Sequence, residues 1–501
     1  MKTRASELED IFFQDVRITQ DNAPKFILNG GDIDIWSGEF SQYHSKSPAE
    51  YVKQRIMDSE KKDEDPLSDV VGKFREKELI KNALLSGSPI LFKGKRGYGK
   101  TTISKTVSKL LPDKLLAIKK CKIYDDPTHP SCFSCKKSLL EDQSVELAWI
   151  PRIWVRIPGD PMLTTRQLIG GLSIQKIREG HDLDDPEVFI PGRALKAHRG
   201  VGYFDELGAV PSSLQTLLHE LFEEKQVTSV DGDIVPFRIE TLEIASTNPA
   251  NYRGTNPIKE PLLDRMEEIE IGAPESLEEE IEIGVRNMYV VRTSEKEHEM
   301  PYWHLKILSR AVRYARTHEK SEIARKIDSE PSCRATIKLF DHVKSRAIRS
   351  NREVPLLSDY GSDYSIAKLA LLGRIEVEYG ASEGKDEIVN KLLDEAIKTT
   401  CREIYDLIPP DRFVKFYGGL FSSAHDSNGQ RYLPLELGFT RKLRENPEIG
   451  SIVAHIAGEQ NITPELFLSA LEITLHSISL CVPKLVERKN GSYLLNELTK
   501  E

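Results

Sequence analysis

The sequence predicts an α/β fold, a parallel sheet flanked by helices, that is followed by a mostly helical region. Between about residues 67 and 272, short apolar runs alternate with helical patterns, as in parallel sheets that helices cover on both faces. From about residue 274 onward the pattern is mainly helical. The expected strands of the sheet centre on residues 90–92, 153–155, 201–204 and 242–245.

The length of 501 residues suggests about three domains, at roughly 150 residues each. We expect an N-terminal leader over residues 1–64, which ends in a polar, charged stretch typical of a linker. The α/β core is expected over residues 65–273, with a cysteine-containing insert at 119–137. A helical lid over residues 274–358 and a mostly helical C-terminal domain over residues 359–501 follow it.

The composition is that of a globular protein with a sizeable core. Hydrophobic residues make up 39% of the chain, and 70 basic against 79 acidic side chains give a formal net charge of −9. The sequence has no apolar run of about 18 residues, so we expect no membrane insertion. The N-terminal residues MKTRASELEDIFF are acidic where a signal peptide is apolar, which favours a cytoplasmic location.

Residues 94–101, Gly-Lys-Arg-Gly-Tyr-Gly-Lys-Thr, match the phosphate-binding pattern G-x4-G-K-[ST], the Walker A motif or P-loop. Its glycines let backbone N–H groups point at phosphate oxygens, and the helix that follows adds the positive end of its dipole. We expect Lys100 to reach the β- and γ-phosphates and Thr101 to ligate Mg²⁺. The alternative is a flexible glycine turn. The expected nucleotide contacts of this loop are Gly94, Gly97, Tyr98, Gly99, Lys100, Thr101 and Thr102.

Polar side chains follow two of the expected strands. Asp205 and Glu206 come directly after the run at 201–204, and ligands collect at the carboxyl ends of parallel strands. We expect Asp205 to hold Mg²⁺ and Glu206 to polarise the attacking water. The alternative for this pair is a strand that runs into an acidic helix cap. Asn248 follows the run at 242–245, where it would bond the γ-phosphate or that water. The alternative for Asn248 is a plain Asn-Pro turn.

Two arginines have two interpretations each. Arg265 is an ordinary surface charge or, in an oligomeric motor, the arginine that reaches the γ-phosphate of a neighbouring copy. Arg334, at the start of a helix in the expected lid, contacts phosphate or is a surface residue. The same helix carries a basic run, which favours a solvated face over a nucleic-acid surface. The residues of this basic run are Lys338, Lys344, Arg346, Arg349 and Arg352.

Taken together, these motifs resemble those of AAA+ ATPases, and more closely the clade that holds the magnesium chelatase ATPase subunit and the MoxR ATPases. The resemblance extends over about residues 67–357, with matching order and spacing. Besides the P-loop, it rests on residues 170–174, 191–200 and 203–206, on Ser-Thr-Asn-Pro at 246–249, on Leu-Leu-Asp-Arg at 262–265, on Ser-Cys-Arg-Ala at 332–335 and on Val-Val-Gly at 70–72.

This resemblance implies an ATP hydrolase that uses ATP and Mg²⁺, forms a homo-oligomeric ring, usually a hexamer, and remodels a partner protein. It also implies a partner with a von Willebrand factor A domain. Asn248, Arg265 and Arg334 would be sensor 1, the arginine finger and sensor 2. Val71 and Gly72 would contact the adenine.

Two alternatives share the same ATPase mechanism. One is the motor subunit of a chelatase that inserts Mg²⁺ or Co²⁺ into a tetrapyrrole. The other is a DNA-acting motor or transcription activator of the same clade, although we do not expect a nucleic-acid partner.

Three of the six cysteines lie within fifteen residues of the insert. Cys132 and Cys135 have the two-residue spacing that lets both sulfurs face one ion, and Cys121 or His129 could complete a tetrahedral zinc site. An Fe–S or redox role and a loop without metal are the alternatives. We expect the isolated cysteines to be buried small apolar residues. They are Cys333, Cys401 and Cys481.

Two β-hairpins are indicated by their turn residues. Asp231-Gly232 is the turn of the first, within residues 226–235. In the resembled family such a hairpin moves with the nucleotide state, and the alternative is a plain surface hairpin. The second has its turn at Asn490-Gly491, after a helical stretch, an order that a winged helix also shows.

Overall fold

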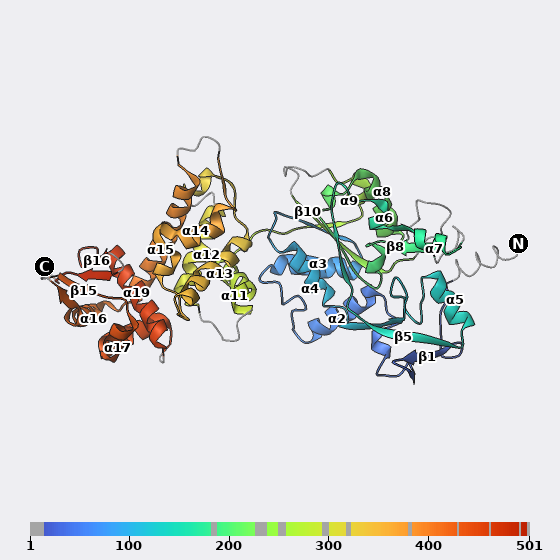
Figure 1. Cartoon of the computed structure of the whole chain (residues 1–501), viewed down its shortest axis with the longest axis horizontal. Helices are drawn as coiled ribbons and strands as arrows, with labels where there is room; N and C mark the ends of the chain where they lie inside the picture. The colour runs from blue at the N-terminus through green and yellow to red at the C-terminus, as the bar shows by residue number, and fades with distance from the viewer. Residues whose placement is uncertain are drawn as a thin grey trace. The chain divides into compact units, whose positions relative to one another are not determined.

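The computed structural model divides the chain into two compact units, Met1–Gly272 and Ala273–Glu501 (Figure 1). The structure describes residues 15–181, 188–225, 238–248, 257–292, 300–316, 322–378, 383–427, 430–459, 462–489 and 492–497. The hairpin expected within residues 226–235 therefore lies outside the described residues, as does the Asn490-Gly491 turn.

A five-stranded sheet with the order β11-β3-β10-β9-β6 forms the centre of the first unit. Neighbouring strands are parallel throughout it. All residues of β10 are buried, as expected for a strand that is covered on both faces. This arrangement confirms the predicted α/β fold. The strands are β3 (Ile90–Lys93), β6 (Trp154–Pro158), β9 (Gly200–Asp205), β10 (Thr241–Thr247) and β11 (Glu267–Glu270), of which β11 was not expected.

Helices connect and cover these strands. Helix α3 (Phe74–Ser86) leads into β3 and ends on Gly87, whose φ of 75° suits a glycine. Helix α4 (Lys100–Ser108) begins directly after β3 and the P-loop. Helix α8 (Ser212–Glu223) buries Leu214, Leu218 and Leu221, spaced to share one face, in the same hydrophobic cluster as strand residues of the sheet. Helix α9 (Glu260–Leu263) is a short turn before β11.

The leader is part of the fold and supplies two strands to a second sheet, with the order β2-β1-β5-β4. Strand β1 (Lys25–Leu28) pairs with β2 (Gly31–Ile33) and runs parallel to β5 (Ser144–Pro151). Strand β4 (Lys114–Ile118) pairs with the other edge of β5. Helix α2 (Pro48–Lys61) then begins with a capping box between Ser47 and Glu50.

Shorter elements complete the first unit. Helix α5 (Phe133–Glu141) follows the cysteine-containing segment and precedes β5. The remaining elements are α6 (Thr165–Leu168), α7 (Ile174–Arg178) and the paired strands β7 (Gly170–Leu172) and β8 (Phe189–Pro191).

The second unit is mainly helical, as predicted. One hydrophobic cluster runs through it from Ile281 to Leu495, so the expected lid and the C-terminal region share a core. The helices are α10 (Leu277–Asn287), α11 (Tyr289–Arg292), α12 (Tyr302–Arg316), α13 (Cys333–Arg349), α14 (Ser365–Leu372), α15 (Lys385–Asp406), α16 (Pro410–Ser423), α17 (Leu437–Glu445), α18 (Pro447–Ala457) and α19 (Pro464–Cys481).

A four-stranded antiparallel sheet with the order β14-β15-β17-β16 lies in the same unit. Strands β16 (Val486–Lys489) and β17 (Ser492–Leu495) pair on either side of the expected Asn-Gly turn. The other strands of the unit are β14 (His425–Ser427) and β15 (Gln430–Leu433), and the separate pair β12 (Ile327–Ser329) and β13 (Glu376–Val377). None of the helices that the structure describes is both long and apolar enough to cross a membrane.

Close packing of α10 on α13 depends on Gly284, because a Cβ at that position would lie 2.3 Å from the buried ring of Phe340. We expect Gly284→Ala to lower the free energy of unfolding by about 1–3 kcal/mol. The matched control is Gly418→Ala in α16, where a Cβ meets nothing within 4 Å. That change should raise stability by up to about 1 kcal/mol through helix propensity. Denaturant unfolding of both variants measures the difference, and equal effects would contradict this packing.

Candidate nucleotide-binding site

The P-loop lies between the carboxyl end of β3 and the first turn of α4. Gly97 and Gly99 have φ angles of 83° and 91°, a region that residues with a Cβ disfavour. Gly94 faces the backbone after β11, because a Cβ there would lie 2.2 Å from the carbonyl oxygen of Ile271. The shape of the loop therefore needs these glycines, and it delivers the chain to the positively polarised start of α4.

Lys100 is buried and turns its ammonium group back into the loop. Its Nζ donates to the carbonyl oxygens of Gly94 and of Lys95, the latter at 3.0 Å, and lies 3.4 Å from Oδ1 of Asn248. Asn248 is buried too, and its Nδ2 has no hydrogen-bond partner among the described residues. The structure thus brings together two residues that lie 148 positions apart in the sequence.

Asp205 ends β9, and three side chains hold its carboxylate. Oδ1 accepts hydrogen bonds from Ser246 Oγ at 2.8 Å and from the Tyr203 hydroxyl at 3.0 Å. Oδ2 accepts one from Arg156 Nε at 2.9 Å. Burial alone would raise the pKa of Asp205, but these hydrogen bonds outweigh burial and lower it. Thr101 Oγ1 lies 3.2 Å from the same tyrosine oxygen, so the two expected Mg²⁺ ligands are close together.

Glu206 follows in a left-handed conformation, with φ 58° and ψ 52°. This turn is possible because Gly159 lies opposite, where a Cβ would be 2.0 Å from the Glu206 carbonyl oxygen. The Glu206 carboxylate lies 3.1 Å from Nη2 of Arg96 in the P-loop. A non-glycine residue held in this conformation stores strain of about 1–3 kcal/mol.

Five residues of this site were not predicted from the sequence. Tyr203 and Asp205 share a face of β9 because strand side chains alternate, so a period-two pattern could have found Tyr203. Gly159 follows the pairing of Pro158 with Asp205, a register that only the folded sheet sets. The unpredicted residues are Arg96, Arg156, Gly159, Tyr203 and Ser246.

Arg265 lies just after α9, where its guanidinium binds residues of its own chain. Nε donates to the Glu223 carboxylate at 2.6 Å, and Nη1 donates to the Pro261 carbonyl oxygen at 2.5 Å. The side chain keeps 30% of its surface exposed. Neither Glu223 nor Pro261 is a P-loop residue, so these contacts do not bring Arg265 to the P-loop of its own chain.

Arg334 belongs to the second unit, where it is exposed near the start of α13. The Ser332 side chain caps this helix by accepting a hydrogen bond from the Arg334 backbone N–H at 3.4 Å. The basic run, which continues past the end of α13 at Arg349, differs from the expected solvated face, and that prediction is wrong for two of its residues. Lys344 is buried and donates to the Glu353 carbonyl oxygen, and Arg352 pairs with the buried carboxylate of Asp359. Of the other basic residues, Arg346 and Arg349 are exposed.

The remaining expected nucleotide contacts lie near the ends of α3 and α4. Val71 and Gly72 are half-buried just before α3, and Gly72 has a φ of 60°. Tyr98 is buried within the P-loop, whereas Thr102 is exposed in the first turn of α4.

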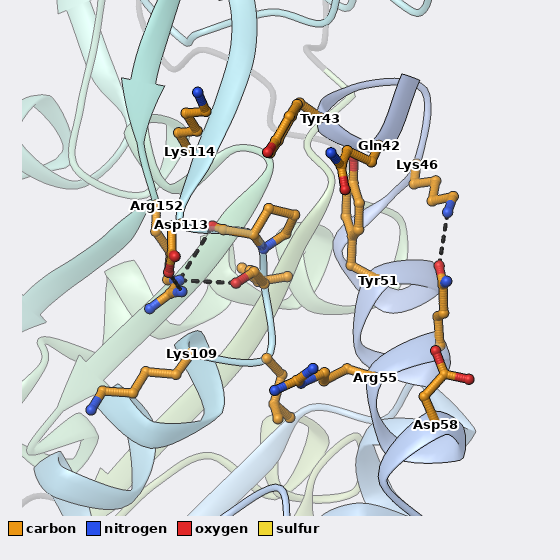
Figure 2. Close-up of a pocket in the computed structure, with 14 residues that line it drawn as sticks. Gln42, Tyr43, Lys46, Tyr51, Arg55, Asp58, Lys109, Asp113, Lys114 and Arg152 are labelled. Carbon is orange, nitrogen blue, oxygen red and sulfur yellow. Dashed lines mark hydrogen bonds and ion pairs between the residues drawn. The ribbon is translucent and has the colours of Figure 1, made fainter. Parts of the chain in front are cut away.

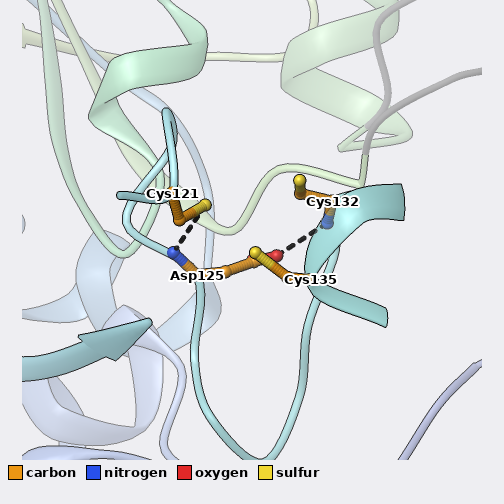
Figure 3. Close-up of side chains that lie close together, drawn as sticks. All are labelled: Cys121, Asp125, Cys132 and Cys135. Carbon is orange, nitrogen blue, oxygen red and sulfur yellow. Dashed lines mark hydrogen bonds between the residues drawn. The ribbon is translucent and has the colours of Figure 1, made fainter. Parts of the chain in front are cut away.

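The insert brings its three cysteines together but places His129 elsewhere (Figure 3). Their sulfur atoms and a carboxylate oxygen of Asp125 all lie within 4.8 Å of one another. His129 instead lies 3.7 Å from Asp15 of the leader. Figure 3 shows Cys121 and Asp125 on one side of the loop, facing Cys132 and Cys135 at the start of α5.

A separate pocket of about 660 Å³ lies between α2, the end of α4 and the start of β4 (Figure 2). Arg152, which lines it, lies two residues before β6, so the pocket is at the amino edge of the central sheet while the P-loop is at the carboxyl edge. Several of its charged groups already have partners: Lys46 binds Gln54, and Arg152 binds Asp113. This pocket is therefore distinct from the candidate nucleotide site.

No family model matches the chain. The magnesium-chelatase 38 kDa subunit of Acidiphilium rubrum is 25% identical to it over 229 residues, which are 44% of this chain and 61% of that protein. The chain thus spans less than two thirds of the length of this curated relative.

Two solved structures are also similar. A cryo-EM-based complex of the BchI and BchD subunits of magnesium chelatase has 20% identity and a TM-score of 0.34, over 65% of this chain and 98% of that one. NtrX of Brucella abortus, in complex with ADP, has 14% identity and a TM-score of 0.33, over 55% of this chain and 51% of that one. These TM-scores are low, and we infer nothing further from the two structures. By its sequence similarity to the chelatase subunit and by its own P-loop and parallel sheet, the chain resembles the AAA+ ATPases of the magnesium chelatase type, as its motifs predict.

Proposed function

We propose that the chain is a Mg²⁺-dependent ATP hydrolase of the AAA+ type that works as a ring oligomer and remodels a partner protein. The observation that carries this proposal is the meeting of Lys100, Asn248, Asp205 and Glu206 at one edge of the central sheet. They come from the P-loop and from the ends of the neighbouring strands β9 and β10. This is the edge of a parallel sheet at which ligands bind.

The described residues fit a nucleotide and its metal ion. The P-loop supplies backbone N–H groups at the start of α4, and Lys100 can exchange its carbonyl partners for phosphate oxygens. Asn248 has its Oδ1 near Lys100, and its Nδ2, which bonds no other described residue, could donate to a phosphate oxygen. Thr101 and the ionised Asp205 would hold Mg²⁺, which supplies positive charge against the phosphates when bound.

Glu206 is the group that would take a proton from the attacking water. Its carboxylate is paired with Arg96, a P-loop side chain that lies close to where the phosphates would bind. We expect Arg96 to exchange this carboxylate for phosphate oxygens once ATP is bound, because a triphosphate carries more charge than one carboxylate. Glu206 would then be free to orient and deprotonate water, while Gly159 and Ser246 keep its backbone in place.

Arg265 favours an oligomer, because its partners in its own chain are not P-loop residues and its side chain is partly exposed. In a ring it would reach the nucleotide of the neighbouring copy and stabilise the charge that develops during hydrolysis. Arg334 would approach the nucleotide from the helical unit as sensor 2. A hexamer is the ring size, and a von Willebrand factor A domain protein the partner, that the resemblance favours.

A motor subunit of a metal–tetrapyrrole chelatase is the second candidate, which the similarity to the magnesium-chelatase 38 kDa subunit favours. Nothing comparable favours a DNA-acting motor. The basic run includes Lys344 of α13 and Arg352 just beyond it, which are bound within the unit rather than available to a phosphate backbone.

Replacing Glu206 tests the proposed chemistry. We expect Glu206→Gln to lower ATP turnover about a hundredfold or more, because the general base is lost, while ATP affinity is retained. Steady-state phosphate release and nucleotide-binding titrations measure the two quantities. The control is Glu141→Gln, an exposed carboxylate at the end of α5, which should leave both unchanged. Unchanged turnover in Glu206→Gln would contradict the role as general base. Because the variant should bind ATP without hydrolysing it, we also expect the ATP-loaded variant to retain the partner protein that the ATPase remodels.

Mixing two inactive variants tests whether Arg265 acts on a neighbouring copy. Arg265→Ala should lower turnover on the order of a thousandfold and leave ATP binding intact, whereas Lys100→Ala should lose binding. In mixed rings about a quarter of the interfaces combine an intact P-loop with an intact Arg265, so the mixture should recover turnover. If Arg265 acts within its own chain, the mixture will show only the summed residual activities.

Gly159 should be needed for turnover although it offers no side chain. A Cβ at this position would displace the Glu206 backbone, so we expect Gly159→Ala to lower turnover about a hundredfold with little change in ATP affinity. Gly38→Ala is the control, since a Cβ there meets nothing within 4 Å. The same phosphate-release and binding measurements apply. A Gly159→Ala variant with normal turnover would show that the tight approach to Glu206 is dispensable.

A further inference from the structure

The segment after β4 and the start of α5 together gather four metal-binding side chains outside the nucleotide site (Figure 3). These are the thiols of Cys121, Cys132 and Cys135 and the carboxylate of Asp125, and their ligand atoms lie within 4.8 Å of one another. Asp125 and Cys135 are buried, and the other two cysteines are half-buried. The proposed ATPase chemistry uses none of them.

Backbone hydrogen bonds hold the four side chains in this arrangement. The Asp125 carboxylate accepts from the backbone N–H of Ser131 at 2.9 Å and from that of Cys132 at 2.7 Å. The Asp125 backbone N–H in turn lies 3.4 Å from the sulfur of Cys121. Cys132 is the N-cap of α5 and Cys135 lies in its first turn, so both sulfurs face the same side. These hydrogen bonds therefore fix Asp125 beside Cys121 and Cys132, and the start of α5 places Cys135 near them.

The number, type and spacing of these donors fit one tetrahedral ion. With zinc–sulfur bonds of about 2.3 Å, tetrahedral geometry places the sulfurs about 3.8 Å apart, so donors within 4.8 Å need only a small adjustment. A multinuclear iron–sulfur cluster binds its cysteines to different iron atoms and spreads them farther apart. Three thiolates and one carboxylate are ligands that Zn²⁺ accepts.

The buried side chain of His198 lies next to the Asp125 carboxylate. His198 Nδ1 accepts a hydrogen bond from the Glu240 backbone N–H at 3.1 Å, so the proton of a neutral ring must be on Nε2. That Nε2 lies 3.3 Å from Oδ1 of Asp125 and makes no hydrogen bond to the described residues, so a small shift would let it donate to the carboxylate. Metal-binding carboxylates are commonly held in this way by a second shell of donors.

We propose that Cys121, Asp125, Cys132 and Cys135 bind one structural Zn²⁺ ion. This ligand set replaces the expected His129 with Asp125, because His129 lies beside Asp15 instead.

The position of the site gives the ion a structural role. The next residue, Asp126, accepts a hydrogen bond from the Ser45 backbone N–H of the leader at 3.0 Å and pairs with Arg199 at 2.8 Å. Thr128 accepts a hydrogen bond from the Ile18 backbone N–H at 2.9 Å. Arg199 directly precedes β9, the strand that carries Asp205. Zinc would therefore stabilise a loop that contacts both the leader and the residue just before this strand.

Metal analysis of the purified full chain, produced without a metal-binding tag, tests the site directly. We expect about one zinc per chain after gel filtration, and none of the other transition metals in comparable amount. Replacement by Co²⁺ should give thiolate-to-cobalt charge-transfer absorption and the intense visible bands of a tetrahedral ion. A wild-type protein that retains no zinc and gives only the pale spectrum of octahedral Co²⁺ would overturn the proposal.

Variants test the ligand set. Cys132→Ser and Asp125→Asn should each weaken metal affinity about tenfold or more, measured by competition with a chromogenic chelator. Two controls should keep the affinity of the wild type: Cys481→Ser, at the end of α19, and His129→Ala. Circular dichroism checks that each variant is folded. If a variant does not fold, the Co²⁺ spectrum of the wild-type protein still tests the site.

Two outcomes would contradict the proposed ligands. If His129→Ala loses the metal while Asp125→Asn keeps it, the histidine is the fourth ligand. If thiol titration of the metal-free chain, purified without reductant, finds two fewer thiols than the reduced chain and zinc does not bind after reduction, the cysteines form a disulfide instead.

Discussion

The packing of the first unit depends on the contacts of the Arg199 guanidinium, because these contacts join segments that are distant in sequence. It pairs with Asp126 at 2.8 Å and donates to the carbonyl oxygens of Leu116 in β4, at 2.8 Å, and of Tyr124 in the insert, at 3.1 Å. A further contact reaches the carbonyl oxygen of Tyr43 in the leader. Burial alone would raise the pKa of Asp126, but Arg199 and Thr128 lower it, so the pair stays charged. Breaking such a buried pair leaves a charge unpaired, at a cost of about 3–5 kcal/mol.

The same residue links this framework to the candidate site, because Arg199 is the last residue before β9. Along β9 the chain passes from a buried ion pair at one end to Asp205 and Glu206 at the other. Strand β10 lies between β9 and β3, so Ser246 can bond Asp205 on one side while Asn248 approaches Lys100 on the other. The parallel arrangement is what turns three separate strand ends into one polar edge.

Local patterns predicted the P-loop, most strands of the central sheet and the two acidic residues after β9, because glycine spacing and buried apolar runs act over a few residues. Features that depend on long-range pairing escaped prediction. Strand β11 reads Glu-Glu-Ile-Glu and exposes three of its four residues, so it lacks a strand-like apolar run. Cysteine spacing could not distinguish His129 from Asp125, since the loop path decides which of them faces the sulfurs. Nor could a basic helix pattern show that Lys344 is buried.

The shared core of the second unit has a mechanical consequence. Helix α13, which carries Arg334, packs into the same hydrophobic cluster as α15, α19 and the C-terminal sheet. Packed cores resist continuous deformation, so a displacement of α13 is not absorbed within the unit. If Arg334 acts as the proposed phosphate sensor, a displacement of α13 would therefore be passed to the helices and strands that share this core. The C-terminal region is in that sense part of the packed element that carries Arg334, rather than an appendage to it.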